Sequence, residues 1–146
     1  MKNSTFVSAL AKFLSENLPN ADIHPFPRKL PPGNLVRGFV GLTTFHIQEV
    51  SSVNGPQTVE GVIVLYVPAS DNDLYSEEWS YFEIIDRWGF DREGSLFRLF
   101  KNDRTLGGIC NAFIAEQFNL LPYEDEDDDY SEGSFWSINI PFRAYV

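Results

Sequence analysis

The chain has 146 residues, of which 43% are hydrophobic and 15% aromatic, so it is long enough to bury one core without disulfides or bound metal. Its 21 acidic and 11 basic residues give a net charge of −10, which argues against specific binding to the phosphates of DNA or RNA. Cys110 is the only cysteine, which excludes an intrachain disulfide, and no run approaches the ~18 apolar residues of a membrane span. We therefore predict one soluble, cytoplasmic domain over residues 1–146.

The N-terminal part predicts a helix followed by an extended connector. Phe6, Leu10 and Leu14 recur at helical spacing, which indicates a helix over residues 4–18 that ends at Pro19. Residues 19–34 are rich in proline and cannot continue a helix. Because this connector also contains apolar residues, we expect it to lie against the body of the protein or a neighbour.

The next segment, 35–67, is typical of a β-hairpin. Residues 35–50 are rich in β-branched and aromatic residues, residues 51–56 suit a turn, and residues 59–67 are apolar almost throughout. The continuous apolar run of the second strand predicts a central position covered on both faces.

Helical patterns follow in the middle of the chain. Residues 73–88 place apolar and aromatic residues on one face, Asp71 or Asp73 can cap this helix, and Gly89 suits its C-terminal end. A shorter helical piece is expected around residues 95–100, and Gly107 with Gly108 breaks whatever precedes residue 109.

The C-terminal part, 111–146, predicts strands joined by an acidic turn. Residues 134–146 alternate between apolar and polar, which is typical of a half-buried strand. Residues 111–121 fit helix by propensity and strand by even spacing, and we favour strand because the final strand needs a partner. Together the patterns predict an α+β fold: a mostly antiparallel sheet of about four strands with helices packed on one face.

The acidic turn is the first candidate site. Its six consecutive carboxylates are Glu124, Asp125, Glu126, Asp127, Asp128 and Asp129. Alternate aspartates resemble the start of a calcium loop, but a loop beginning at Asp125 needs Gly at 130 and Glu at 136, where the chain has Tyr130 and Trp136. A solvated hairpin tip and a functional acidic rim are the remaining interpretations.

No catalytic or cofactor motif is visible. His24 and His46 have no Cys or His neighbour at the spacing of a zinc site. Cys110 is best interpreted as a small buried thiol, and no local signature of a serine or cysteine nucleophile is present. No glycine-rich phosphate loop occurs either. We predict a protein that is not an enzyme and holds no cofactor or metal.

Basic residues are sparse, and five of them gather in the middle third of the chain: Arg87, Arg92, Arg98, Lys101 and Arg104. With the acidic turn elsewhere, such a molecule can carry one positive and one negative patch, which suits association between identical subunits. Ordinary surface salt bridges, each worth little, explain the same residues equally well.

The order of these elements resembles the tail-terminator proteins of long-tailed bacteriophages, also called minor tail or tail-completion proteins. The features shared are the N-terminal helix, the proline-rich connector, the hairpin ending in Val67-Pro68-Ala69, a helix containing Trp79, and an acidic turn before a Phe135-Trp136 strand. Residues 30–35 and the Gly107-Gly108 break have no counterpart in the family pattern.

The resemblance implies a structural virion protein made in the host cytoplasm. Members form homohexameric rings that cap the tail tube, stop its growth and join it to neck or head-completion proteins. It further implies that residues 124–129 lie at the channel or ring rim, where they repel the DNA that passes without being bound, and that Arg87 to Arg104 contact a subunit or the tube. A different class, a small acidic inhibitor or immunity-type protein that binds a basic enzyme, also fits the acidic turn; an enzyme with dispersed catalytic residues is a third alternative.

Overall fold

The protein folds as two helices and a six-stranded mixed sheet within the part of the chain that its computed structural model describes, residues 3–18, 21–28, 36–46, 58–68, 85, 88, 95–122 and 135–146. The elements, in chain order, are α1 (Asn3–Asn17), β1 (Ala21–His24), β2 (Val36–His46), β3 (Thr58–Pro68), α3 (Leu96–Asn102), β4 (Ala112–Ile114), β5 (Asn119–Pro122) and β6 (Phe135–Tyr145). The expected α+β class is therefore observed, with more strand than helix.

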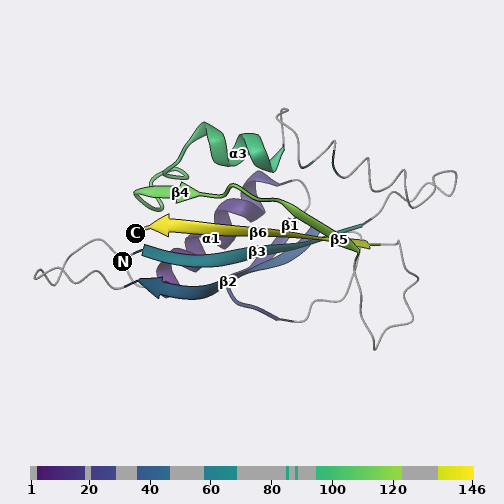
Figure 1. Ribbon diagram of the computed structural model, residues 1–146, viewed down its shortest axis with the longest axis horizontal. Coiled ribbons are helices and arrows are strands. Elements are labelled where there is room, and N and C mark those ends of the chain that lie inside the picture. Colours follow the sequence, from purple (N-terminus) through teal and green to yellow (C-terminus); the bar gives the residue numbers. More distant parts are fainter. Residues whose placement is uncertain are drawn as a thin grey trace, which may run out of the picture.

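The sheet has the order β1-β2-β3-β6-β4, and β5 also pairs with β6 (Figure 1). Every pairing is antiparallel except that of β1 with β2, which is parallel. The expectation of about four mostly antiparallel strands was thus imprecise. The two additional strands come from the proline-rich connector and from the division of the segment before β6.

The hairpin predicted over residues 35–67 is formed by β2 and β3, whose register pairs Arg37 with Tyr66 and His46 with Thr58. One irregularity interrupts it between Leu42 and Thr44, where the extra residue is Thr43. β3 lies between β2 and β6, so its predicted central position is confirmed.

The strand β1 lies inside the segment predicted as a connector. Its Ile23 is buried, and the backbone amide of Ile23 donates a hydrogen bond of 3.2 Å to the hydroxyl of Ser15 on α1. This contact gives a partner to a backbone group of a short edge strand, which would otherwise be available to another chain.

A proline explains why the partner of β6 is divided into β4 and β5. The amide of Asn111 donates to the carbonyl of Tyr145, so the polar backbone groups of Tyr145 face β4. Backbone groups alternate along a strand, and those of Pro141 therefore face the same side. Because proline has no N–H to donate, the ladder is interrupted beside it. The strand predicted for residues 111–121 is confirmed in type, but it is two short strands.

The buried side of the sheet is covered by α1 and bordered by α3. Phe6, Leu10 and Leu14 of α1 are fully buried, as their spacing predicts. A series of ring contacts joins the two helices across this side: Phe6 to Phe142 at 6.3 Å, Phe142 to Phe113 at 5.1 Å and Phe113 to Phe100 at 5.1 Å between centroids. Both helices thus contribute to one core on the same side of the sheet.

The helix α3 confirms the helical piece expected around residues 95–100. The buried hydroxyl of Ser95 accepts a 3.1 Å hydrogen bond from the amide of Arg98 and caps the helix. The helix expected over residues 73–88 lies outside the described residues except for Ile85 and Trp88. Trp88 is 1% exposed and belongs to the core.

Candidate functional site

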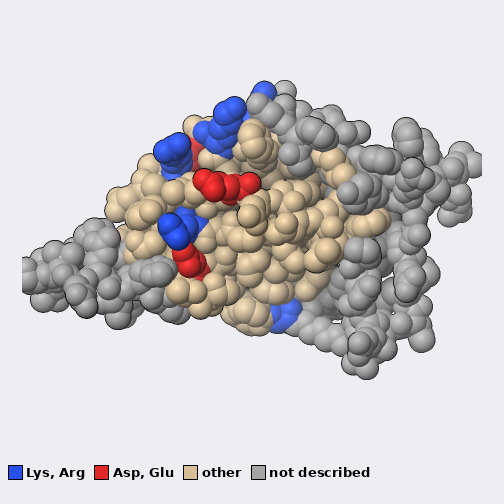
Figure 2. Space-filling model, viewed as in Figure 1, with Lys and Arg blue, Asp and Glu red and all other residues tan. Residues whose placement is uncertain are grey.

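The side of the sheet opposite α1, which we call the open face, is not covered by either described helix (Figure 1). Its centre consists of the mostly apolar residues Phe39, Val62, Val64, Tyr66, Asn139 and Pro141, with Glu60 and Arg143 at one end and Asp22 and Arg37 at the other. Figure 2 shows that the middle of this face carries few charged side chains. An apolar centre between charged ends is the usual composition of a protein–protein interface.

The centre of the open face is continuous across three strands. Phe39 of β2 lies opposite Val64 of β3, and Val62 lies opposite Pro141 of β6. The rings of Phe39 and Tyr66 are 6.4 Å apart. Pro141 is exposed and the other four side chains are partly buried, whereas Ile63, which points to the other side of β3, has no exposed surface. The sequence predicts that β3 is covered on both faces, and among the described residues the two faces differ, because both described helices lie on one side of the sheet.

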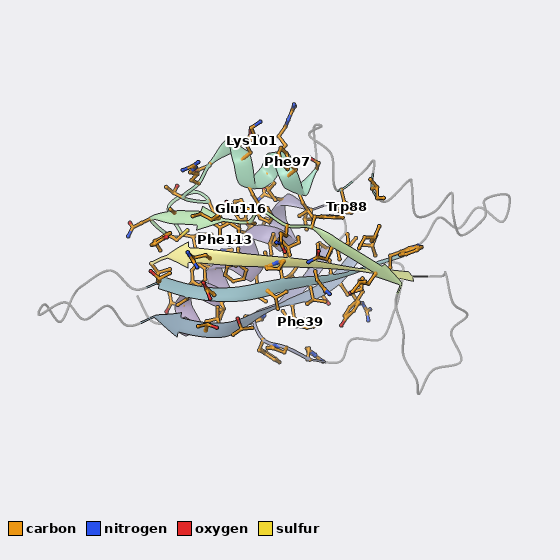
Figure 3. All side chains as sticks on the ribbon, viewed as in Figure 1. Phe39, Trp88, Phe97, Lys101, Phe113 and Glu116 are labelled. Atoms are coloured by element: carbon orange, nitrogen blue, oxygen red, sulfur yellow. The ribbon has the colours of Figure 1, made fainter. Side chains whose placement is uncertain are left out.

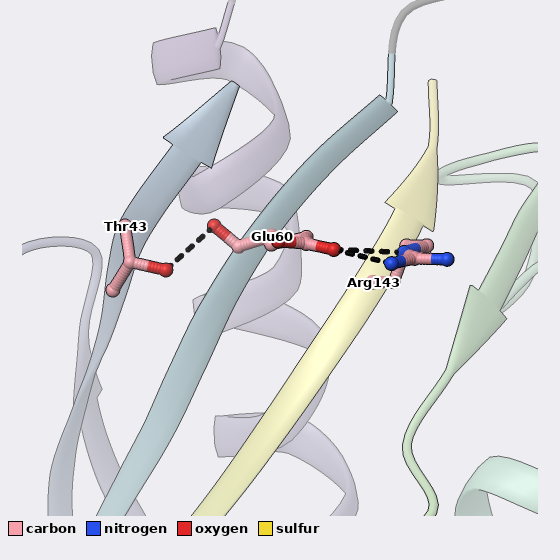
Figure 4. Close-up of polar contacts among 3 residues, drawn as sticks. All are labelled: Thr43, Glu60 and Arg143. Carbon is pink, nitrogen blue, oxygen red and sulfur yellow. Dashed lines mark hydrogen bonds and ion pairs between the residues drawn. The ribbon is translucent and has the colours of Figure 1, made fainter. Parts of the chain in front are cut away.

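One end of the open face is polar. Arg143 Nε donates a 2.9 Å hydrogen bond to Glu60 Oε1, and Thr43 Oγ1 donates to the backbone carbonyl of Glu60 at 3.3 Å (Figure 4). Hydrogen bonding to Glu60 raises the pKa of Arg143. A groove of about 480 Å³ lies beside this pair, next to the interrupted ladder at Pro141, and Ile114, Glu116 and Gln117 form its other wall.

A second groove, which we call the α3 groove, lies between α3 and β4 and has a volume of about 430 Å³. Its lining residues are Phe97, Phe100, Lys101, Arg104, Phe113, Ile114, Ala115 and Glu116. The tilted ring pair of Phe100 and Phe113 gives it an apolar floor. Lys101 Nζ lies 5.5 Å from the centroid of the Phe97 ring, which is itself 50% exposed (Figure 3).

The loop after α3 holds one side of this groove in place. The carboxylate of Asp103 accepts hydrogen bonds from the amide and hydroxyl of Thr105, at 2.9 and 2.7 Å, and from the amide of Gly107 at 2.8 Å. The hydroxyl of Thr105 is the largest of the causes that lower the pKa of Asp103. Gly107 and Gly108 have φ values of +75° and +92°, which explains why glycines occupy the predicted break.

The loop is also joined to β4, because the carbonyl of Arg104 accepts a 2.7 Å hydrogen bond from the amide of Phe113. This bond fixes Arg104 beside β4. Sequence reasoning missed the role of Asp103, although an Asp two residues before a Thr and four before a Gly is a pattern that can identify such a turn.

Three of the five basic residues expected to act together do lie together. Arg98, Lys101 and Arg104 are exposed on α3 and the loop that follows it, where Figure 2 shows the Lys and Arg side chains gathered. Arg87 and Arg92 lie outside the described residues. So do all six carboxylates of the acidic turn, from Glu124 to Asp129, which belong to the connection between β5 and β6.

The remaining candidate residues from the sequence are Cys110, His24 and His46. Cys110 is buried, and burial, followed by the charge of Asp103, raises the pKa of its thiol to about 11, which fits the predicted inert thiol. His24 lies 3.3 Å from the carboxylate of Asp22, and His46 belongs to β2. Within the described ranges, no three His, Cys, Asp or Glu side chains are grouped so that they could hold a metal ion.

Comparison with protein families and with curated proteins finds no match for this chain. None of the helices in the described residues has the length and apolar character needed to cross a membrane. The open face and the α3 groove are therefore the candidate functional surfaces among the described residues.

Proposed function

We propose that this chain is the tail terminator of a long-tailed bacteriophage, a structural virion protein that is made in the host cytoplasm. In this proposal, six copies form a ring on the end of the tail tube, stop its polymerisation and present a surface to a neck or head-completion protein. The protein works through shape and surface charge, and it makes or breaks no covalent bond.

The observation that carries the proposal is the open face. A small subunit that covers one side of its sheet with its own helices leaves Phe39, Val64 and Tyr66 partly exposed on the other. Contiguous apolar surface of this kind marks contact sites for other proteins. We assign this face to contact with the end of the tail tube, where the sheet surface can cover the tube subunit below it.

The net charge supports the same proposal. Six subunits at −10 each carry −60 in total, and a ring with that charge repels DNA that passes through its channel. Adhesion of the genome to the channel wall is thereby prevented without any specific contact.

The test has two measurements on the purified full chain. Native mass spectrometry gives the number of copies in the assembly, for which we expect six. Electron microscopy then measures tube length when the chain is added to polymerising tail-tube protein encoded in the same genome, and we expect tubes to stop growing and carry a ring at one end.

Val64→Lys, on the open face, provides the specific variant: it should abolish capping while the unfolding midpoint stays close to that of the wild type. Lys12→Gln, on the exposed side of α1, is the control and should cap normally. Tubes that grow unchanged in the presence of folded wild-type chain would contradict the proposal. A tight one-to-one complex with a basic enzyme would instead favour the inhibitor or immunity-type alternative.

A further inference from the structure

We infer that the α3 groove binds the acidic segment, residues 123–130, of a second copy of the chain. The inference rests on the proposed function for the ring in which this contact would recur, since a contact between two different surfaces of identical subunits can close into a ring. It goes beyond that function by naming the two surfaces and the chemistry that joins them.

The groove offers an apolar floor and a cationic rim. Phe100 and Phe113 form the floor, and the half-exposed ring of Phe97 continues it toward solvent. Lys101 and Arg104 are exposed on the rim. Arg98 is exposed on the same short helix, about one turn before Lys101. A ligand that suits this groove presents aromatic or aliphatic groups to the floor and carboxylates to the rim.

The acidic segment has this composition. Its sequence from 123 to 130 is Tyr-Glu-Asp-Glu-Asp-Asp-Asp-Tyr, six carboxylates between two aromatic rings. The sequence has one other run of consecutive carboxylates with aromatic neighbours, Glu77-Glu78 between Tyr75 and Trp79, and it carries two carboxylates instead of six. The charge of the segment is therefore complementary to the rim, and its tyrosines are complementary to the floor.

Chain length indicates that the segment comes from a second copy. Pro122 of β5 pairs with Trp136, whereas Phe113 of β4, beside Arg104, pairs with Ala144. Eight residues of β6, from 136 to 144, separate the two places, which corresponds to about 27 Å at ~3.4 Å per residue. Asp128 is six residues from Pro122, so a fully extended chain carries its backbone at most about 22 Å from that anchor. A molecule therefore reaches the Arg104 end of its own groove only if the segment is fully extended and the side chains span the remaining distance, whereas a second copy is under no such constraint.

Isotope-resolved photo-crosslinking tests the contact directly. The full chain is made with benzoylphenylalanine in place of Phe97, in one unlabelled and one ¹⁵N-labelled preparation, and the two are mixed and irradiated. We expect crosslinks between light and heavy peptides that map to residues 123–130. Crosslinks only within one isotope, crosslinks to other segments, or no crosslinks would overturn the inference.

Peptide binding tests the chemistry. A fluorescent peptide of residues 121–131 is titrated into full chain whose six carboxylates at 124–129 are changed to Asn or Gln, so that no chain supplies a competitor. We expect saturable binding that weakens as the salt concentration rises. The double variant Lys101→Glu, Arg104→Glu should lose affinity by about tenfold or more. The control Lys12→Glu, Arg28→Glu has the same net charge change at exposed positions outside the groove and should bind within about twofold of the parent.

Glu116→Lys gives a gain that unfolding cannot imitate. Glu116 is exposed on the wall of the α3 groove opposite the cationic rim, so reversal of its charge should tighten peptide binding by several-fold, on the order of the effect of one added charge contact. Unchanged or weaker binding in this variant, or equal loss in the control double variant, would overturn the inference.

These outcomes are separable from failure of the proposed function. If the wild-type chain caps tail tubes while the peptide and crosslinking tests fail, the terminator proposal stands and the groove assignment is wrong. If the chain leaves tubes unchanged but the peptide binds as described, the contact between copies stands and the virion role is wrong.

Discussion

The two sides of the sheet differ in what covers them, although the same strands build both. In β3, Ile63 and Leu65 point toward α1 and have no exposed surface, whereas Val64 and Tyr66 point away from it and are partly exposed. The residue types on the two sides are similar. The difference shows that apolar residues on a strand favour burial, but they do not specify what buries them. The covering surface can belong to the same chain or to another molecule.

The largest effect is expected from a matched pair of alanine substitutions on β3. Ile63→Ala leaves a cavity in the fully buried core and should cost about 2–5 kcal/mol in the free energy of unfolding. Val64→Ala, one residue away on the open face, should cost less than about 1 kcal/mol in the isolated chain. Urea unfolding followed by fluorescence measures both. Equal losses would show that something also covers the open face in the isolated chain.

Thiol chemistry compares a buried position with an exposed one. With a pKa of about 11, Cys110 should react with iodoacetamide at pH 8 about 100-fold more slowly than an ordinary cysteine, because its thiolate population is smaller by that factor. A thiol introduced by Thr43→Cys at the exposed bulge should react at the ordinary rate. Alkylation followed by mass spectrometry distinguishes them, and denaturant should make the two rates equal.

The same thiol makes stability depend on pH. The pKa of Cys110 is raised in the folded state, so the unfolded chain ionises first as pH rises from about 9 to 11. The contribution of the neutral thiol to stability is therefore present below pH 9 and is lost across that window. Cys110→Ser should remove this part of the pH dependence.

Two glycines test how tightly the sides are packed. A Cβ at Gly61 would lie 2.7 Å from the ring of Phe142 and even closer to the carbonyl of Gly41, so Gly61→Ala should cost about 1–3 kcal/mol. A Cβ at Gly41 would lie 3.2 Å from the exposed ring of Pro27 on the open face, which can move aside, and Gly41→Ala should cost less than about 1 kcal/mol. Comparison of their unfolding midpoints is sufficient, and a reversed order would contradict the assignment of faces.

The smallest effect is expected at the polar end of the open face. The ion pair of Glu60 and Arg143 is solvent-exposed, and such pairs contribute little to stability. Arg143→Gln should leave the unfolding midpoint of the isolated chain essentially unchanged at moderate salt, as measured by thermal denaturation. A large destabilisation would mean that this end is buried by contacts between copies under the conditions of the measurement.

Much of the fold could be predicted because its elements depend on local periodicity. The spacing of Phe6, Leu10 and Leu14 specified α1, and alternation over residues 134–146 specified β6. β1 was missed because the prolines around it suggested a connector, and four residues are too few to show a period. The grouping of basic residues was predicted for five positions, and the three that lie in the described region, Arg98, Lys101 and Arg104, meet on one surface.

The sequence by itself determined the longer elements and the charge: a period of 3.6 or 2 residues identifies helices and strands over a few neighbouring positions, and the carboxylates are counted directly. Only the tertiary structure decided which side of the sheet is covered, where the ladder beside Pro141 is interrupted, and how Arg104 comes to lie beside Phe113. The physical reason is the separation along the sequence between the residues that make contact. Those features depend on contacts between residues far apart in the chain, and no local pattern specifies which distant partner a strand or side chain will meet.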